Sequence, residues 1–172
     1  MIHAGFGEIV LSSATTNFDF DDGHSDPIDL LTFFPNGLNL FGDVHTELFV
    51  NVNGSLTFGE PQTDFIPSAF NGQATEGIFP KAPRIAGFWS DIDLTRGPLG
   101  VSPEGTSTGT NEIYVDFDDV AGILTVTWDD VGYATDTTPL DLVNAFQIQI
   151  VRIGNGDFDI IFRYESIDWV NG

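Results

Sequence analysis

The side chains best suited to chemistry in this sequence are carboxylates, and two of them end an apolar stretch. Residues 83–93 read PRIAGFWSDID, so Asp91 and Asp93 stand two positions apart, directly after Phe88 and Trp89. On an extended chain, residues i and i+2 project from the same face. Like charges at that spacing repel each other unless an arginine, backbone N–H groups or a cation lie beside them. The spacing therefore predicts either a calcium-binding carboxylate pair or a strand end that enters a solvated acidic loop.

A second group of carboxylates crowds around a glycine nearer the N-terminus. Residues 18–29 read FDFDDGHSDPID. Calcium prefers carboxylate and carbonyl oxygens, but Gly23 occupies the position of the third ligand in a regular Asp-x-Asp-x-Asp-Gly loop. The stretch is therefore either a solvated acidic turn or part of a calcium site. The candidate ligands of such a site, together with the pair above, are Asp19, Asp21, Asp22, Asp26, Asp91 and Asp93.

The chain as a whole is strongly acidic. Its 172 residues include 26 aspartates and glutamates but 5 lysines and arginines, which gives a formal net charge of −21. Nucleic acids and anionic membrane surfaces bind clustered cations, so the composition argues against both as partners. No apolar run approaches the roughly 18 residues of a membrane span, and we expect no membrane insertion. The charge makes calcium the cofactor to expect, if the chain uses one.

The residues that nucleophilic catalysis needs are scarce. The sequence has no cysteine, a single lysine (Lys81), and three histidines, none of them near a serine in a Gly-x-Ser-x-Gly turn. The acidic doublets 118–119 and 129–130 could serve a glycosidase, but neighbours on a strand point to opposite faces, so neither doublet makes a natural acid–base pair. We therefore predict that the chain is not an enzyme.

Apolar and polar residues alternate along several short segments that end in turn residues. The segments are 48–52, 113–117, 124–128, 146–150 and 158–162. Alternation with a period of two is typical of strands with one buried face, whereas no segment has the 3.6-residue period of a helix. The sequence therefore predicts an all-β fold, an antiparallel β-sandwich with long polar loops and little helix.

More local predictions follow from the same pattern. The turn residues 35–37 between the apolar runs 30–34 and 38–41 indicate a hairpin, and so does Asn53-Gly54 within 47–58. Residues 59–82 and 96–111 lack a period and are expected to be loops. The residues expected to be largely buried are Phe88, Trp89, Val126, Trp128, Phe146, Ile148, Ile150, Phe158, Ile160 and Phe162.

Five blocks of the sequence, in order, resemble the nidogen-like (NIDO) domain. They are FVNVNGSLTFG (49–59), PRIAGFWSDID (83–93), LTVTWDDVGY (124–133), NAFQIQI (144–150), and DFDIIFRY with IDW (157–164 and 167–169). Gly87 stands where the family commonly has proline. The acidic residues 22–30 resemble the lead-in of bacterial members of the family. The resemblance therefore covers about residues 18–172.

The resemblance implies an extracellular or cell-surface module of adhesion and matrix assembly, of a bacterial adhesin type, with no catalytic activity. Its partners would be a protein or a glycan of the matrix or cell surface. The family usually adds a last strand that this sequence lacks. Residues 1–17 are accordingly expected to form an edge strand or a strand donated to a neighbouring chain.

Two alternative functions stay open at this point. One is a structural subunit that self-associates through an exposed β-edge and builds an extracellular filament by strand exchange. The other is a carbohydrate-binding β-sandwich, for which Trp89, Trp128 or Trp169 would have to stack on sugars.

Overall fold

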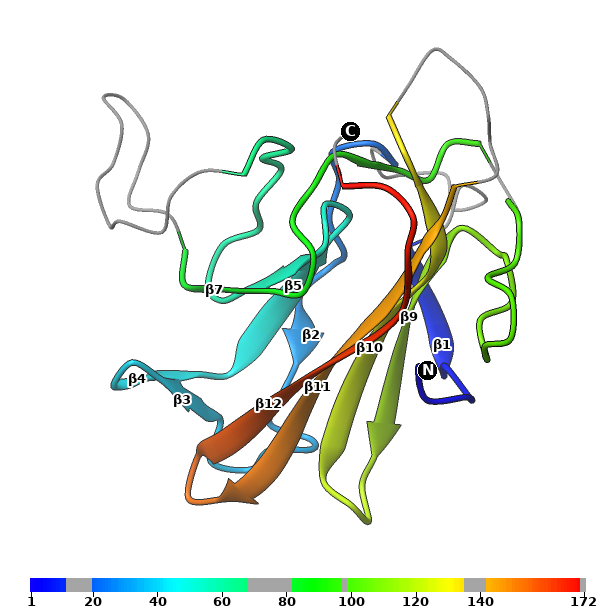
Figure 1. Cartoon of the computed structure of the whole chain (residues 1–172). Coiled ribbons are helices and arrows are strands. Elements are labelled where there is room, and N and C mark those ends of the chain that lie inside the picture. Colours follow the sequence, from blue (N-terminus) through cyan, green and yellow to red (C-terminus); the bar gives the residue numbers. More distant parts are fainter. Residues whose placement is uncertain (12–19, 68–81, 97–98, 135–141, 171–172) are drawn as a thin grey trace, which may run out of the picture.

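In the computed structural model, which describes residues 1–11, 20–67, 82–96, 99–134 and 142–170, every regular element is a β-strand (Figure 1). The strands are β1 (Glu8–Leu11), β2 (Ile28–Asp29), β3 (Leu38–Leu40), β4 (Asp43–His45), β5 (Glu47–Asn51), β6 (Ser55–Thr57), β7 (Arg84–Ala86), β8 (Ile92–Asp93), β9 (Glu112–Asp118), β10 (Ile123–Tyr133), β11 (Asn144–Gly154) and β12 (Asp157–Ile167). No helix that could cross a membrane occurs in these ranges.

The larger sheet is an antiparallel meander. Its order is β1-β9-β10-β11-β12, and β8 pairs with the end of β10. Figure 1 shows β1 and β12 at opposite rims of this sheet. The predicted alternation holds in its centre, where Trp128 on β10 pairs with Phe146 on β11 and the next inward pair is Val126 with Ile148. The all-β antiparallel sandwich predicted from the sequence is confirmed.

The smaller sheet has the order β2-β5-β6-β7, and β3 and β4 form a separate hairpin. The turn between β5 and β6 lies at Asn53-Gly54, as predicted, and Gly54 has a φ of +79° that favours glycine. The hairpin predicted between 30–34 and 38–41 is wrong. The N–H groups of Phe33 and Phe34 donate to Leu30 O and close a turn there, so that β3 pairs with β4 instead.

The hydrophobic core lies between the two sheets. Trp128 and Phe146 are fully buried, and the Trp128 indole N–H donates to Val52 O at 3.0 Å, which ties the large sheet to the β5–β6 turn. Of the residues predicted to be buried, the structure confirms Val126, Trp128, Phe146, Ile148 and Ile150, whereas Phe88, Trp89 and Phe158 are half-buried.

The burial predicted for Ile160 and Phe162 is wrong. Both lie on β12 and are 38% and 42% exposed. Residues next to β7 cover β11, since a Cβ on Gly87 would lie 3.0 Å from Ile148 Cγ1. On β12, Tyr164 reaches this layer with its hydroxyl, 2.7 Å from Gly87 O. The sequence of β12 alternates as if one face were covered. Because β12 lies at the rim of the sheet, however, that face stays partly exposed.

The N-terminal segment forms an edge strand of its own chain. Glu8 pairs with Val115 and Ile9 with Tyr114, so β1 extends the large sheet beside β9. This is the edge opposite β12, and the rest of the expected segment, residues 12–19, lies outside the described residues.

Candidate functional site

The side chain of Asn53 joins three segments that are far apart in the sequence. Its Oδ1 accepts a hydrogen bond from Ile92 N at 2.8 Å, and its Nδ2 donates to Asp22 Oδ1 at 2.9 Å. Asn53 is 2% exposed, so both bonds form away from bulk water, where an unpaired amide would be costly. The β5–β6 turn, the acidic turn and the strand that ends in Asp93 are thus held together.

Glycine is required next to this asparagine. Gly54 O accepts from Gly87 N at 3.1 Å and from Phe88 N at 3.3 Å, and a Cβ on Gly54 would lie 1.7 Å from Phe88 O. Movement of a neighbouring side chain could not make room for this Cβ, because the atom in its way, Phe88 O, belongs to the backbone. The Asn-Gly turn and the stretch 83–93 are therefore two halves of one contact.

The two carboxylates that end this stretch have different surroundings. Asp93 is 7% exposed and accepts from the N–H of Thr95 at 2.7 Å, from the Thr95 hydroxyl, and from Arg96 Nε at 3.3 Å. Asp91 is partly exposed, and its burial, followed by the negative charges of Asp22 and Asp93, raises its pKa above the usual range. Asp91 is therefore the carboxylate whose repulsion a cation would relieve most.

The calcium prediction stays a prediction. Among the residues that the structure describes, no group of three or more His, Asp or Glu side chains is close enough to hold a metal ion. Asp19 lies outside the described residues, and Asp26 is exposed at the far end of the acidic turn. Asp21, Asp22 and Asp91 are each partly exposed.

Arg84, the other arginine near the pair, serves a different contact. Its guanidinium lies 3.9 Å from the ring centroid of Trp89 and 3.6 Å from Asp64 Oδ2, while the indole N–H of Trp89 donates to Asp64 O at 2.9 Å. This cation–π contact covers one face of the half-buried Trp89. With Trp128 and Trp169 at 0% and 4% exposure, neither of these two indoles offers a platform for sugars.

A second acidic centre, which the sequence pattern did not reveal, lies in β10. Asp129 and Asp130 are both fully buried. The register of β10 on β11 shifts between Trp128 and Val131, and Asp130 has a φ of +48°, so the doublet sits in a bulge. Both carboxylates bind the loop that precedes β9.

Each carboxylate of the doublet has its own donors. Asp129 accepts from the N–H and hydroxyl groups of Thr108 and Thr110, at 2.6 to 3.2 Å. Asp130 accepts from Gly109 N at 2.9 Å and from Ser102. Burial raises the pKa of Asp130, the hydroxyl donors oppose that shift, and the charge of Asp129 adds to it. These carboxylates organise the 99–111 loop and are not free to act on a ligand.

A further carboxylate, which is partly exposed, anchors the N-terminus. Glu165 on β12 accepts from the N–H groups of Thr106 and Ser107 at 2.9 Å and from Ile2 N at 3.0 Å. Burial acts to raise the pKa of Glu165, but these donors outweigh it and hold the pKa at about 2. One side chain thus joins the N-terminal residues, the 99–111 loop and the last strand.

Glu165 should make the unfolding free energy of the protein depend on pH in the acidic range. Its pKa is about 2 when folded, against an ordinary 4.5, so its contribution is complete above pH 4.5 and is lost as the pH falls toward 2. We expect Glu165→Gln to lose about 1–2 kcal/mol of unfolding free energy at pH 7, since the amide keeps one acceptor oxygen and partial exposure screens the charge. Urea unfolding at pH 7 and pH 3 measures this, and an equal difference between variant and parent at both pH values would contradict it.

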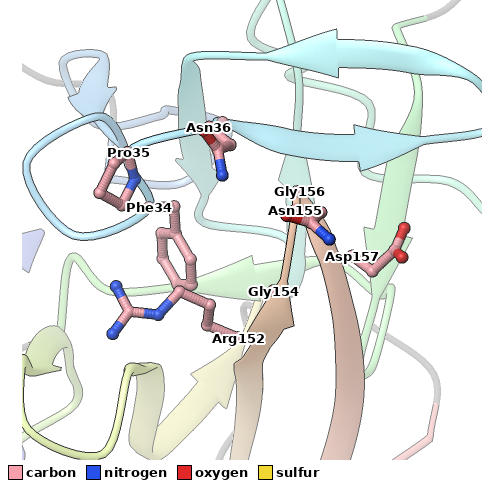
Figure 2. A pocket seen from close by; sticks show the side chains of 9 residues that line it. Phe34, Pro35, Asn36, Arg152, Gly154, Asn155, Gly156 and Asp157 are labelled. Atoms are coloured by element: carbon pink, nitrogen blue, oxygen red, sulfur yellow. The ribbon is translucent and has the colours of Figure 1, made fainter.

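Two hollows in the described part of the surface lie away from these centres. One, of about 240 Å³, lies between the turn at 34–37 and the β11–β12 hairpin, where Figure 2 shows Arg152 below the ring of Phe34. The Arg152 guanidinium donates to Phe33 O at 2.6 Å. The other hollow, of about 510 Å³, lies where β1 and β9 face β2, and combines Ile9, Phe33 and Phe117 with the carboxylates of Glu8 and Asp116.

Comparison with known proteins identifies the family. A family model described as "Nidogen-like domain" matches residues 46–172. Alpha-tectorin of Homo sapiens is 31% identical over 166 residues, which cover 88% of this chain and 7% of the relative. Nidogen of Drosophila melanogaster is 23% identical over 190 residues, which cover 92% of this chain and 13% of the relative. No solved structure matches.

These comparisons define what is shared. The chain spans a small part, 7% to 13%, of the length of these relatives, so the likeness is that of one module. The bacterial type expected from the acidic lead-in receives no support, because the relatives are animal proteins. The family model covers about three quarters of the chain, including both halves of the contact between the Asn-Gly turn and residues 83–93. This chain therefore belongs to the nidogen-like domain family.

Proposed function

We propose that this chain is a non-catalytic, extracellular module through which a matrix or cell-surface protein binds a protein partner. The observation that carries the proposal is membership of the nidogen-like family, with nidogen and alpha-tectorin as relatives. The engaged carboxylates support it, because Asp93, Asp129, Asp130 and Glu165 each accept hydrogen bonds from their own chain. Holding loops and strands together is the role expected of such carboxylates in a non-catalytic module.

The larger hollow is the surface that we propose for the partner. Its apolar floor and its two carboxylates, Glu8 and Asp116, suit a segment that carries apolar and basic side chains. The charge of the whole chain favours the same kind of partner, since a net charge of −21 steers cationic surfaces toward it. A glycan-binding role has less support, since two of the three tryptophans are in the core.

Binding assays on purified material test this function. The chain would be titrated against a panel of purified extracellular-matrix proteins, a glycan array and chromogenic glycosides. We expect saturable protein binding that Asp116→Lys weakens and that Asp119→Lys leaves unchanged. Asp119 is the control because it follows β9 directly but is exposed and does not line the hollow. Binding to glycans alone would favour the carbohydrate alternative, and turnover of a glycoside would overturn the non-catalytic role.

We also propose that calcium stabilises the fold near Asp22 and Asp91. The support is the raised pKa of Asp91, caused first by burial and then by the negative charges of Asp22 and Asp93, whose repulsion a hard cation would relieve. At 100 times its Kd, an ion that binds one site of the folded chain adds about 2.7 kcal/mol of stability. Thermal melts in calcium, in magnesium and in chelator at matched ionic strength measure this, and Asp91→Asn should remove the calcium shift. Equal midpoints in calcium and chelator would mean that no such site exists.

The filament alternative has a structural requirement of its own. Strand exchange would need β1 to leave β9 of its own chain, where Glu8, Ile9 and Leu11 are paired. β12 is an edge strand too, with no described strand on its outer side, and it leads to a different kind of association.

A further inference from the structure

The outer edge of β12 is regular over seven residues. β12 is the last strand of the large sheet, and among the described residues no strand pairs with its outer side. Register shifts interrupt its pairing with β11 at both ends, between Ala145 and Phe146 and between Arg152 and Gly154. Between these shifts, Phe158–Tyr164 pair one to one with β11. Half of the backbone N–H and C=O groups of this segment point away from β11.

One face of the segment, with Phe158, Ile160, Phe162 and Tyr164, is apolar, and Ile161 lies on the other face between two charged residues. Ile160, Ile161, Phe162 and Tyr164 are 38%, 39%, 42% and 45% exposed. Two hydrogen bonds from other segments to backbone oxygens lie near its ends. Gly156 O accepts from Asn39 N at 2.8 Å, and Tyr164 O accepts from the Met1 amino group at 3.3 Å. An edge of this length and composition pairs with another strand unless its charges prevent it.

The charges of this edge are arranged symmetrically about its midpoint. Ile161 is the central residue of 158–164, and Asp159 and Arg163 stand two positions before and after it. Both project from the same face as Ile161, because residues two apart share a face. Arg163 Nε donates to Gln149 Oε1 at 2.7 Å, which holds the guanidinium in place and leaves its terminal nitrogens available.

We propose that two copies of this chain pair antiparallel through β12, about a twofold axis at Ile161. Asp159 of each copy then faces Arg163 of the second copy, and Ile160 faces Phe162. Opposite charges and apolar pairs directly across an antiparallel ladder are favourable. The six-stranded sheets join into one continuous sheet, and no strand is exchanged.

The same charges specify the geometry. A parallel arrangement in register would place Asp159 against Asp159 and Arg163 against Arg163, which is unfavourable. The contact is isologous, since the same segment serves on both sides, so association closes at a dimer. Glu165, next along the strand, does not disturb the pairing, because its carboxylate is engaged by Ile2, Thr106 and Ser107 of its own chain. The inference does not depend on the matrix partner proposed above.

Charge reversal in two single variants tests the dimer. Asp159→Arg places four arginines across the two-fold axis, and Arg163→Asp places four aspartates there. We expect sedimentation equilibrium at about 0.15 M salt to give a wild-type monomer–dimer equilibrium, and each variant alone to raise the dimer dissociation constant by at least about tenfold. Far-ultraviolet circular dichroism checks that each variant is folded.

An equal mixture of the two variants is the decisive measurement. In a heterodimer, both arginines of one copy face both aspartates of the other, so the mixture should regain dimers that neither variant forms alone. The double variant Asp159→Arg/Arg163→Asp should self-associate like the wild type, because its charges are exchanged. A wild type that stays monomeric at high concentration, single variants that dimerise as well as the wild type, or a mixture that stays monomeric would each overturn the proposal.

Discussion

Replacing Trp128 by alanine should destabilise the domain by about 3–5 kcal/mol, a large share of the stability of a domain of this size. Trp128 is fully buried, and its ring stacks on Phe146 at a centroid distance of 4.8 Å and an interplanar angle of 10°. The substitution leaves a cavity between the sheets and deprives Val52 O of the indole N–H that reaches it at 3.0 Å. Urea unfolding followed by circular dichroism measures the loss.

Two further variants separate the contributions of packing and hydrogen bonding. Trp128→Phe keeps an aromatic ring against Phe146 but removes the donor to Val52 O, and should cost about 1–3 kcal/mol. Val120→Ala changes a side chain that is 99% exposed, and should leave the urea midpoint unchanged within about 0.5 kcal/mol. If Trp128→Ala unfolds at the same urea concentration as the wild type, this residue does not connect the sheets. Loss of glycan binding in such a variant would instead assign Trp128 to a sugar site.

The strands and the Asn53-Gly54 turn could be predicted from the sequence because their causes are local. Alternation of apolar residues places β9, β10 and β11 correctly, and Asn53-Gly54 is a turn because Gly54 needs a positive φ. The resemblance to a family placed that turn and residues 83–93 in one domain. The structure adds their contact, in which Asn53 Oδ1 and Gly54 O accept hydrogen bonds from N–H groups of this stretch.

Gly87, the one departure from the family pattern within this stretch, has an explanation in the same contact. Its N–H donates to Gly54 O at 3.1 Å. Proline, the common residue at this position, has no N–H to donate. A Cβ at Gly87 would also lie 3.0 Å from Ile148 Cγ1 and 3.2 Å from Phe146 Cδ2, so the glycine allows close packing on β11.

The exposure of β12 could not be predicted from its own residues. Its alternation is as regular as that of β11, but burial depends on whether a second layer lies over the strand. That layer is built by residues about 70 positions earlier, since Tyr164 bonds Gly87 with a separation of 77 residues. A pattern with a period of two identifies a strand with one apolar face and does not report what covers that face.

The roles of the acidic residues were the hardest to predict for a similar reason. The structural role of Asp129 and Asp130 could not be predicted from their positions, because the rule for adjacent residues assumes a regular strand and the bulge removes that assumption. Their donors lie 19 to 28 residues earlier, at Ser102 and in residues 108–110, where the hydroxyl-bearing residues were the available signal. A run of serines and threonines close to an unpaired acidic doublet in the same sheet is the pattern to look for.

Removing the carboxylate of Asp129 should have the second large effect on stability. The side chain is fully buried and accepts from the backbone and hydroxyl groups of Thr108 and Thr110. In Asp129→Ala, these donors lose their acceptor at a fully buried position, although Thr108 itself is exposed and Thr110 is partly exposed. Each unsatisfied group costs about 1–3 kcal/mol, and some of them will regain water as the loop moves, so we expect a total loss of about 3–5 kcal/mol.

Asp119→Ala is the matched control for this prediction, because it makes the same change in the other acidic doublet, where the side chain is exposed. It should leave stability unchanged within about 0.5 kcal/mol. Hydrogen exchange adds a local readout: the amides of Thr108 and Thr110 should exchange faster in Asp129→Ala, while those of β11 stay protected under conditions where the variant is folded. If the two alanine variants unfold at the same urea concentration, the carboxylate of Asp129 does not hold the loop. The amides of Thr108 and Thr110 could instead stay protected although stability falls. The loss would then arise in β10 itself, where Asp129 pairs with Glu112 and its backbone O accepts from Asn111 N.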